Sequence, residues 1–535
     1  MHRDLHDTES RLTSSPGVTP AIAIRSSSPG AFKLTIEHLW IGLPLFVVLW
    51  KSFVFPLPLL DFWWHLKMGE VIATTASIPR TDLFSFTNFG NLFVLQNWLA
   101  ELLYYGTYRL GGFPLLVLSN SLLLVAGFIP IYALCVRAAG SVRMGALVAF
   151  AAAIGGYVNM RPQNFSFVLF SYYYWILVCY RTRRRDWVWM LPLLMIIWVN
   201  LHGAFVLGIA LVGLYLASES VRRIIDPART DALTTGELRK LLFVFVLCIA
   251  ATFMSPELFK VYDYVQGVMA YQQFVAEWQP PKIDDALGIL AFYGPLFAGI
   301  LVFTYARVKP NLTDIAVFLA FAVLGLKSLR NAAWFGIVAY PLIAQHLPTI
   351  SSRSLMSLRR FPWVDRIAVL LHFSNRDAQP HFRMNVLVAS LALLVLAAQS
   401  PWIRPSLYKT SLFDVNTPVA AMDFIDSHDL NGNIYHPQIY GDYLIWRLWP
   451  KQKSFFDGRV HIFDLEFVRD YLRLPQDSHW EQLLARWNIR YLLLSKNPND
   501  EENVKMAHAA QASGHWTKLY EDGISVIFEK NSRPE

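Results

Sequence analysis

Apolar runs of membrane length dominate this chain. A helix needs about 20 largely apolar residues to cross a bilayer, and a shorter run can still span with local adjustment. The runs lie near 34–55, 113–136, 144–160, 164–180, 187–203, 204–220, 241–256, 286–306, 312–326, 331–347 and 384–400. The stretch from Trp187 to Ala217 is too long for one helix, and Asn200–Gly203 is its natural break. The sequence therefore predicts a polytopic α-helical membrane protein with about eleven spans.

The composition excludes a soluble globular protein, because 54% of the residues are hydrophobic and only 16% are charged. The 18 tryptophans fit rings concentrated at lipid interfaces. A net charge of +8 does not indicate nucleic acid here, because the basic residues sit in short loops between the apolar runs. Cys135, Cys179 and Cys248 lie within apolar runs, so we interpret them as buried small residues and not as disulfides or metal ligands.

Three regions follow from the composition along the chain. Residues 1–32 are rich in Ser, Pro and Thr and are predicted to form a disordered cytoplasmic tail. Residues 33–400 form the transmembrane domain, which includes a long first outer loop at 57–112. Residues 401–535 have no run of membrane length and alternate short strands with helices, which predicts a small α/β domain. The expected strands are 433–436, 454–457, 491–495 and 525–529, and the expected helices are 418–427, 480–487 and 504–512.

Basic residues set the predicted orientation. Arginines and lysines concentrate in alternate loops, at 137–143, 181–185, 222–240, 307–309 and 353–383. Because short cytoplasmic loops carry the excess of Lys and Arg, these loops and the N-terminus are placed in the cytoplasm. An odd number of spans then places the α/β domain on the periplasmic or extracellular side. We expect a multi-pass protein of the inner (plasma) membrane.

Varied polar chemistry collects in the predicted outer loops. Ionisable groups at membrane depth are functional candidates by default. Asp61 and His65 follow the first run and stand one helical turn apart among tryptophans. The full set of candidate site residues is Asp61, His65, Arg161, His202, Glu277, Trp278, Lys327 and Arg330.

Each candidate also has a structural interpretation. Asp61 could be a helix N-cap, or it could simply pair with His65. These two residues are too few ligands to indicate a metal. Arg80 and Asp82 could form a turn with a surface ion pair, and His202 could be a hydrogen-bonded interior histidine. The three outer basic residues could extend to lipid headgroups; these are Arg161, Lys327 and Arg330.

The layout of the chain resembles that of the GT-C glycosyltransferases, and in particular a bacterial mannosyltransferase-like group. The shared features are a first span, a long outer loop opening with an aspartate, two interfacial helices, about eleven spans and an outer α/β domain. Where this family often carries Asp-Glu or a similar acidic pair, Asp61 is followed by Phe62. The segments Gly441–Trp446 and Phe456–Arg459 resemble a signature of one lineage, and the sequence assigns them no role.

The resemblance implies an enzyme that moves a sugar from a polyprenyl-phosphate donor to an acceptor at the outer face of the membrane. Asp61 would be the general base, and His65 would orient it or the acceptor. The basic residues would clamp the phosphate, and Glu277 and Trp278 would hold the sugar. No metal or other cofactor is expected. The expected partners are membrane lipid, a lipid-linked sugar and a glycan, lipid or protein acceptor, with no nucleic acid.

Two other classes remain open at the level of sequence. A transporter or lipid flippase would carry charged residues deep within its spans. A membrane scaffold would use the outer domain to bind a partner, through the exposed-looking Trp446, Trp449 and Trp480. Binding of polyprenyl phosphate would separate an enzyme or flippase from a scaffold, and sugar transfer without translocation would separate the enzyme from the flippase.

Overall fold

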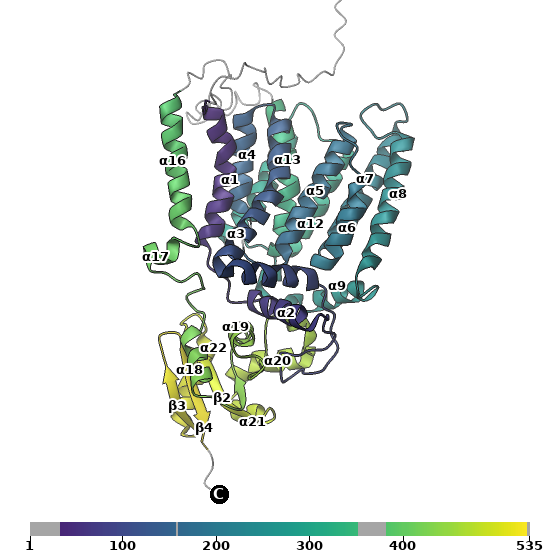
Figure 1. Ribbon diagram of the computed structural model, residues 1–535. Helices are drawn as coiled ribbons and strands as arrows, with labels where there is room; N and C mark the ends of the chain where they lie inside the picture. Colours follow the sequence, from purple (N-terminus) through teal and green to yellow (C-terminus); the bar gives the residue numbers. More distant parts are fainter. Residues whose placement is uncertain (1–32, 157–158, 351–380, 532–535) are drawn as a thin grey trace, which may run out of the picture.

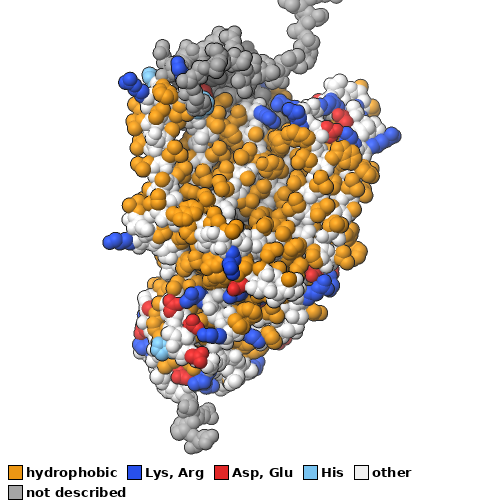
Figure 2. All heavy atoms as spheres, in the orientation of Figure 1, with side chains coloured by type: hydrophobic (Ala, Val, Ile, Leu, Met, Phe, Trp, Pro, Cys, Tyr) orange, Lys and Arg blue, Asp and Glu red, His pale blue; other side chains and the backbone are white. Residues whose placement is uncertain are grey.

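The computed structural model describes residues 33–156, 159–350 and 381–531, so the predicted tail at 1–32 lies outside the described residues. A helical bundle makes up most of the molecule, and a layer of strands and short helices covers one end of it (Figure 1). Figure 2 shows hydrophobic side chains over the sides of the bundle, with charged side chains gathered at its ends and on the layer. This distribution is that of a helical membrane protein with a polar domain at one end.

Every predicted apolar run is helical. The bundle helices are α1 (Ile36–Val54), α3 (Trp98–Ala139), α4 (Val142–Gly155), α5 (Gln163–Arg181), α6 (Met190–Leu201), α7 (Phe205–Ile225), α8 (Thr235–Ala251), α10 (Ala286–Gly288) continuing through η4 (Ile289–Tyr293) into α11 (Gly294–Tyr305), α12 (Leu312–Lys327), α13 (Ala332–His346) and α16 (Phe382–Gln399). In the described part of the chain, five segments are long and apolar enough to cross a membrane: α1, α3, α7, Ala286–Tyr305 and α16. The structure thus confirms the helical membrane class, and the count of eleven spans stays a prediction.

Two helices lie across the end of the bundle, where the long outer loop was predicted. One is α2 (Phe62–Thr75), and the other is the first part of α3, which bends at Gly111 and Gly112 before it enters the bundle (Figure 1). Gly112 has φ +63°, a backbone conformation that glycine adopts without strain. A Cβ on Gly69 would lie 2.1 Å from the carbonyl oxygen of Glu101, so glycine permits the close contact of α2 with α3.

The C-terminal layer contains a mixed four-stranded sheet in the order β1-β2-β4-β3. Its strands are β1 (Asn433–Tyr435), β2 (Ile489–Ser495), β3 (Trp516–Glu521) and β4 (Ser525–Lys530). β1 and β2 are parallel, and the other pairs are antiparallel. The helices of the layer are α17 (Arg404–Tyr408), α18 (Val419–Ser427), α19 (Gln438–Leu448), α20 (Leu465–Arg473), α21 (Trp480–Ala485) and α22 (Glu501–Ser513). The small α/β architecture agrees with the prediction.

Shorter helices connect these elements. On the bundle side, α9 (Lys260–Ala270) leads to two 3-10 helices, η2 (Gln272–Phe274) and η3 (Ala276–Trp278), and η5 (Leu329–Asn331) separates α12 from α13. The remaining 3-10 helices are η1 (Thr252–Met254), η6 (Leu347–Thr349), η7 (Val460–Ile462) and η8 (Leu474–Gln476). η3 and η5 both supply candidate site residues.

The expected strand at 454–457 is wrong. Ser454 forms only an isolated bridge with Ser85 of the first outer loop, and the segment is a loop. Its apolar residues are buried against other aromatic rings and not in the sheet: the Phe456 ring lies 4.4 Å from the ring of Tyr471. The sequence also missed β3, α19 and α20.

Aromatic packing docks the layer on the bundle. Trp63 of α2 is fully buried, and its ring lies 4.8 Å from that of Tyr443 in α19 and 5.1 Å from that of Phe413. Trp446 faces the same cluster, with its ring 5.2 Å from that of Tyr108. A large buried aromatic contact of this kind fixes the two parts relative to each other.

The tryptophans considered for a scaffold surface are engaged inside the molecule. The Trp449 indole N–H donates to the Leu83 carbonyl at 3.0 Å, and Trp480 is only 7% exposed and stacks on Trp516. Trp446 is half-buried in the aromatic contact with the bundle. The sequence interpretation of these three residues as exposed is therefore wrong.

Candidate active site

Asp61 occupies an unusual backbone conformation. It stands at the N-cap position of α2 with φ 66° and ψ −51°. A residue with a side chain pays about 1–3 kcal/mol for such a conformation, and strained residues of this kind concentrate at functional sites. Its carboxylate makes no capping bond to the helix. The N-cap interpretation therefore describes the position of Asp61 but not what its side chain contacts.

The Asp61 carboxylate pairs with Arg161. Arg161 Nε lies 3.2 Å from Asp61 Oδ2, and Arg161 Nη1 lies 2.5 Å from Glu277 Oε2. Arg161 precedes α5 and is buried, whereas the side chains of Asp61 and Glu277 are 26% and 35% exposed. The guanidinium thus bridges two partly accessible carboxylates and does not extend to lipid headgroups.

Arg330 of η5 lies beside Trp278 of η3. Its guanidinium carbon is 5.7 Å from the centre of the indole ring, and Arg330 Nε donates to Gln163 Oε1 at 2.5 Å. The two loops are joined by the Ser328 hydroxyl, which donates to the Glu277 carbonyl at 3.2 Å. Arg161 and Arg330 therefore both stand at the N-terminal end of α5, where the helix dipole adds positive potential.

Lys327 differs from the other two basic candidates. It ends α12, its residue is exposed, and its backbone carbonyl accepts from Gln272 Nε2 at 3.1 Å. The structure brings the backbone of Lys327 to the site, while its side chain lies on the surface.

His65 pairs with Glu101 within the described structure, and not with Asp61. His65 Nδ1 lies 2.9 Å from Glu101 Oε1, and both residues are buried. The contact with Asp61 is through the backbone, since the His65 amide donates to the Asp61 carbonyl at 3.3 Å. Burial lowers the pKa of His65 well below its usual range, and the nearby His202 and Arg161 lower it further. His65 is therefore a neutral imidazole at pH 7.

His202 is held by the bundle. It follows α6, and its Nδ1 lies 2.9 Å from the Ser166 hydroxyl, which also accepts from the Trp198 indole N–H at 2.7 Å. His202 is half-buried. The structure places it near the site as a hydrogen-bonded histidine.

A buried ion cluster beside the site escaped the sequence analysis. Arg459 Nη1 lies 2.7 Å from Asp82 Oδ1, and Arg459 Nη2 lies 2.7 Å from Asp457 Oδ2. All three side chains are fully buried. Asp82 is therefore not part of a surface ion pair, as one interpretation of the sequence held. The cluster joins the first outer loop to the C-terminal layer, and Phe456–Arg459 was its visible sequence signal.

Asp442 of α19 was also missed. The Asp61 amide donates to its Oδ2 at 2.5 Å, and the Gly458 amide donates to its Oδ1 at 2.8 Å. Asp442 is completely buried, inside the segment Gly441–Trp446 to which the sequence assigned no role.

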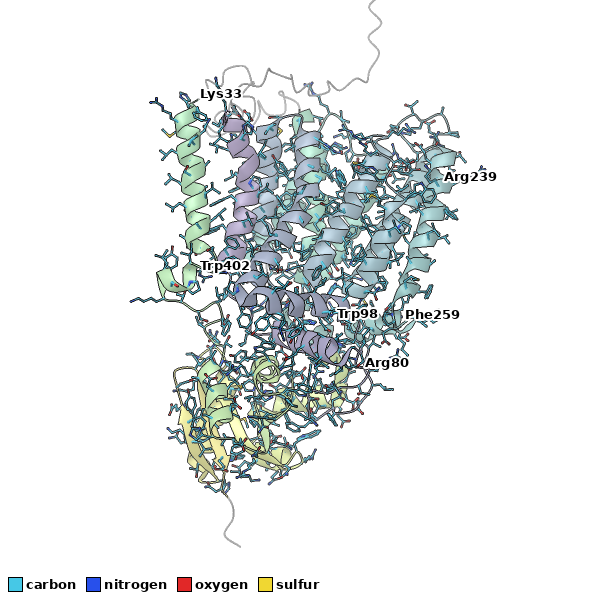
Figure 3. All side chains as sticks on the ribbon, in the orientation of Figure 1. Lys33, Arg80, Trp98, Arg239, Phe259 and Trp402 are labelled. Atoms are coloured by element: carbon cyan, nitrogen blue, oxygen red, sulfur yellow. The ribbon has the colours of Figure 1, made fainter. Side chains whose placement is uncertain are left out.

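The site elements meet at one end of the bundle. In Figure 3, Arg80, Trp98 and Phe259 lie at the end that the C-terminal layer covers, and Lys33 and Arg239 lie at the opposite end. Among the described residues, no three His, Cys, Asp or Glu side chains are grouped so as to hold a metal ion. The site contains two partly exposed carboxylates, two arginines and an indole.

The bundle, the two helices across its end and the α/β layer form a fold shared with two solved structures, an oligosaccharyltransferase and an arabinofuranosyltransferase, in agreement with the fold that the sequence resemblance implied. The chain is similar to the archaeal oligosaccharyltransferase AglB from Archaeoglobus fulgidus, solved in complex with an inhibitory peptide and a dolichol-phosphate. The TM-score is 0.50 and the sequence identity is 12%, and the alignment covers 93% of this chain and 74% of AglB. It is also similar to the arabinofuranosyltransferase AftD from Mycobacteria, with a TM-score of 0.50, 13% identity, and coverage of 94% and 42%.

ArnT from Cupriavidus metallidurans bound to undecaprenyl phosphate also aligns with this chain, with a TM-score of 0.43, 14% identity, and coverage of 92% and 97%. No protein-family model matches the sequence. No curated protein matches it either.

Proposed function

We propose that this chain is a membrane glycosyltransferase that moves a sugar from a polyprenyl-phosphate donor to an acceptor hydroxyl, on the membrane face covered by the C-terminal layer. The observation that carries the proposal is the strained, partly exposed Asp61 paired with Arg161. The GT-C fold supports the general reaction. We propose further that this face is periplasmic or extracellular and that the N-terminus is cytoplasmic, because arginine-rich loops occupy the opposite end.

The chemistry assigns each charged group a part. The acceptor oxygen attacks the anomeric carbon, Asp61 takes the hydroxyl proton, and the bond from that carbon to the phosphate oxygen breaks. The leaving polyprenyl phosphate keeps the electron pair. General base help contributes about 10²–10⁴-fold. Arg161 and Arg330, with the N-terminus of α5, stabilise the charge that develops on the phosphate.

Trp278 and Glu277 line the space that we assign to the sugar. The Trp278 indole N–H is buried and has no hydrogen-bond acceptor among the described residues, so a sugar hydroxyl can accept from it. The Glu277 carboxylate, 35% exposed, can accept from a second hydroxyl. His65 is buried and pairs with Glu101, and the half-buried His202 is bonded to Ser166, so we assign neither of them a contact with the sugar.

A small apolar cavity lies in the bundle near the start of α13. It has a volume of about 90 Å³ and is lined by Phe167, Gly127, Gly336, Ala332 and Ala333. The two alanines begin α13, directly after η5, which carries Arg330. This cavity has room for only a short stretch of a polyprenyl chain, and we assign it to the part of the chain next to the phosphate.

The test is transfer of labelled sugar by purified protein in lipid nanodiscs. We expect Asp61→Asn to lower the transfer rate about 10²-fold or more, because the amide cannot take the proton. The matched control is Glu70→Gln on the same helix, where Glu70 only pairs with Lys67 at the surface. Undiminished transfer by Asp61→Asn rules out Asp61 as the base, and translocation of the lipid-linked sugar without transfer assigns the flippase class instead.

A further inference from the structure

A carboxyl group from the C-terminal layer contacts the backbone of Asp61. Asp442 Oδ2 accepts from the Asp61 amide, and Asp442 Oδ1 accepts from the Gly458 amide. Both oxygens of a completely buried side chain are therefore used to hold two backbone amides, one from each part of the molecule. Because the Asp61 amide belongs to the residue with the strained backbone, this contact bears directly on where the Asp61 carboxylate lies.

Gly458 leaves no room for adjustment at this contact. A Cβ at Gly458 would lie 2.6 Å from Asp442 Oδ2 and 2.7 Å from Asp61 Oδ1. The two carboxyl groups thus lie against the same glycine, and any side chain there would displace them. The loop containing Gly458 is in turn fixed by the buried ion pairs of Arg459 with Asp457 and Asp82.

We propose that Asp442 is a positioning residue for Asp61, and that the C-terminal layer is by this contact part of the catalytic site. The proposal rests on the function proposed above. The layer supplies the bond that keeps Asp61 in its strained conformation, with the carboxylate turned to Arg161 and not to the end of α2. A displacement of a catalytic group by about 1 Å can cost 10²-fold in rate, so a fixed backbone matters here.

Burial and two neighbouring carboxylates act on the pKa of Asp442. The charged groups that face it are Asp61 from the start of α2 and Asp457 from the loop after α19, and these are paired with Arg161 and Arg459. Burial raises the pKa of Asp442 well above its usual range, and Asp457 and Asp61 raise it further, whereas the bonds from the Gly458 and Asp61 amides lower it.

The experiment compares Asp442→Asn with Asp423→Asn, an exposed aspartate of the same layer that pairs only with Arg447. An amide cannot accept from both backbone N–H groups, so Asp61 is released. We expect Asp442→Asn to lower kcat by about 10- to 100-fold with the donor KM within about twofold of the parent. Asp423→Asn should retain the parent activity.

Two further readouts separate positioning from loss of fold. The double variant Asp61→Asn/Asp442→Asn should be no slower than Asp61→Asn alone, because both changes act through one carboxylate. Size-exclusion profiles and melting temperatures in detergent show whether Asp442→Asn has folded. If it has not, Gly458→Ala is tested in its place, because a Cβ at Gly458 displaces the same two carboxyl groups.

The outcomes are distinct. Parent kcat in Asp442→Asn overturns the inference and leaves the glycosyltransferase proposal standing. Additive losses in the double variant also overturn it, because Asp442 would then act independently of Asp61. A parent protein that transfers no sugar from any polyprenyl-phosphate donor overturns the proposed function itself, and the inference with it.

Discussion

At the scale of single residues, Arg161 is the centre of the charged site. Its side chain is buried, and it contacts Asp61 through one nitrogen and Glu277 through another. A planar guanidinium can make both contacts at once, whereas a lysine ammonium is a point charge. The position of the Asp61 carboxylate therefore depends on the shape of this cation as well as on its charge.

The first prediction concerns this shape. We expect Arg161→Lys to keep the positive charge but to lower the transfer rate about 10- to 100-fold, because one ammonium cannot hold both carboxylates in place. The measurement is steady-state sugar transfer in nanodiscs. Arg109→Lys is the control, since Arg109 is a surface residue that contacts Tyr105. Equal rates for Arg161→Lys and the parent would contradict the bridging role.

The second prediction uses the protonation of Asp442. Its pKa is raised above the usual 3.8, so the folded protein holds a proton that the unfolded chain loses above pH 3.8. Stability from this group is fully present below that value and is lost as the pH rises through the folded pKa. We expect the melting-temperature difference between the parent and Asp442→Asn to be largest at acid pH and to shrink as pH rises. A difference that grows with pH would show an ionised Asp442.

At the scale of elements, α2 and the first part of α3 act as one platform. Gly69 brings them together, and the buried pair of His65 with Glu101 lies between them. The aromatic residue Trp63 on α2 contacts the C-terminal layer. Since Asp61 directly precedes α2, the position of this helix against the bundle determines the position of the Asp61 carboxylate.

The third prediction tests the platform. A Cβ at Gly69 would lie 2.1 Å from the Glu101 carbonyl oxygen, whereas a Cβ at Gly106 on α3 meets nothing within 4 Å. We expect Gly69→Ala to destabilise the protein by about 1–3 kcal/mol, because the two helices must separate. Gly106→Ala should leave stability unchanged or raise it slightly. Thermal unfolding of both variants in detergent makes the comparison, and equal melting temperatures would contradict the close contact.

The elements also show which features a sequence can predict. The apolar runs were found because a bilayer requires about 20 apolar residues in succession, which is a local property. Strand β3 (Trp516–Glu521) was missed because its exposed positions carry Lys518 and Glu521, so no apolar run marks it. The 454–457 segment was assigned to a strand because its phenylalanines look like a buried strand, although they pack on other rings.

In the candidate site, too, some residues could be predicted from the sequence and some contacts could not. Asp61, Arg161 and Arg330 were picked out because charge at a membrane boundary is costly wherever it stands. The bond from Asp61 to Asp442 joins residues 381 positions apart, and that from Arg459 to Asp82 joins residues 377 apart. Local periodicity and residue spacing do not reveal contacts between residues so far apart in the sequence. The segments Gly441–Trp446 and Phe456–Arg459 could therefore be recognised only as unusual.

At the scale of the whole molecule, the buried cluster of Arg459 with Asp82 and Asp457 joins the bundle to the C-terminal layer. The cluster sets two buried carboxylates against one guanidinium, so both carboxylates depend on Arg459 for their opposite charge. The aromatic contact around Trp63 forms the other half of this junction.

The fourth prediction addresses the junction. We expect Asp82→Asn to destabilise the protein by about 1–3 kcal/mol, because Arg459 loses its charge-assisted hydrogen bond to the Asp82 carboxylate while its pair with Asp457 remains. Limited proteolysis should cut faster between the bundle and the layer, and the melting temperature should fall. Asp426→Asn, which removes only an exposed pair with Lys451, is the control. An unchanged cleavage rate for Asp82→Asn would assign the docking to the aromatic contact alone.

The bond between the Asp61 amide and Asp442 has a consequence for biosynthesis. Asp61 is translated early, directly after the first predicted span, whereas Asp442 is translated only after all the predicted spans. A ribosome-bound chain that stops before residue 401 would therefore contain the complete bundle but would lack the contact of Asp442 with the Asp61 amide. We expect such a nascent protein to be inserted yet inactive, so that sugar transfer starts only once the C-terminal layer has been made and Asp442 holds the Asp61 amide.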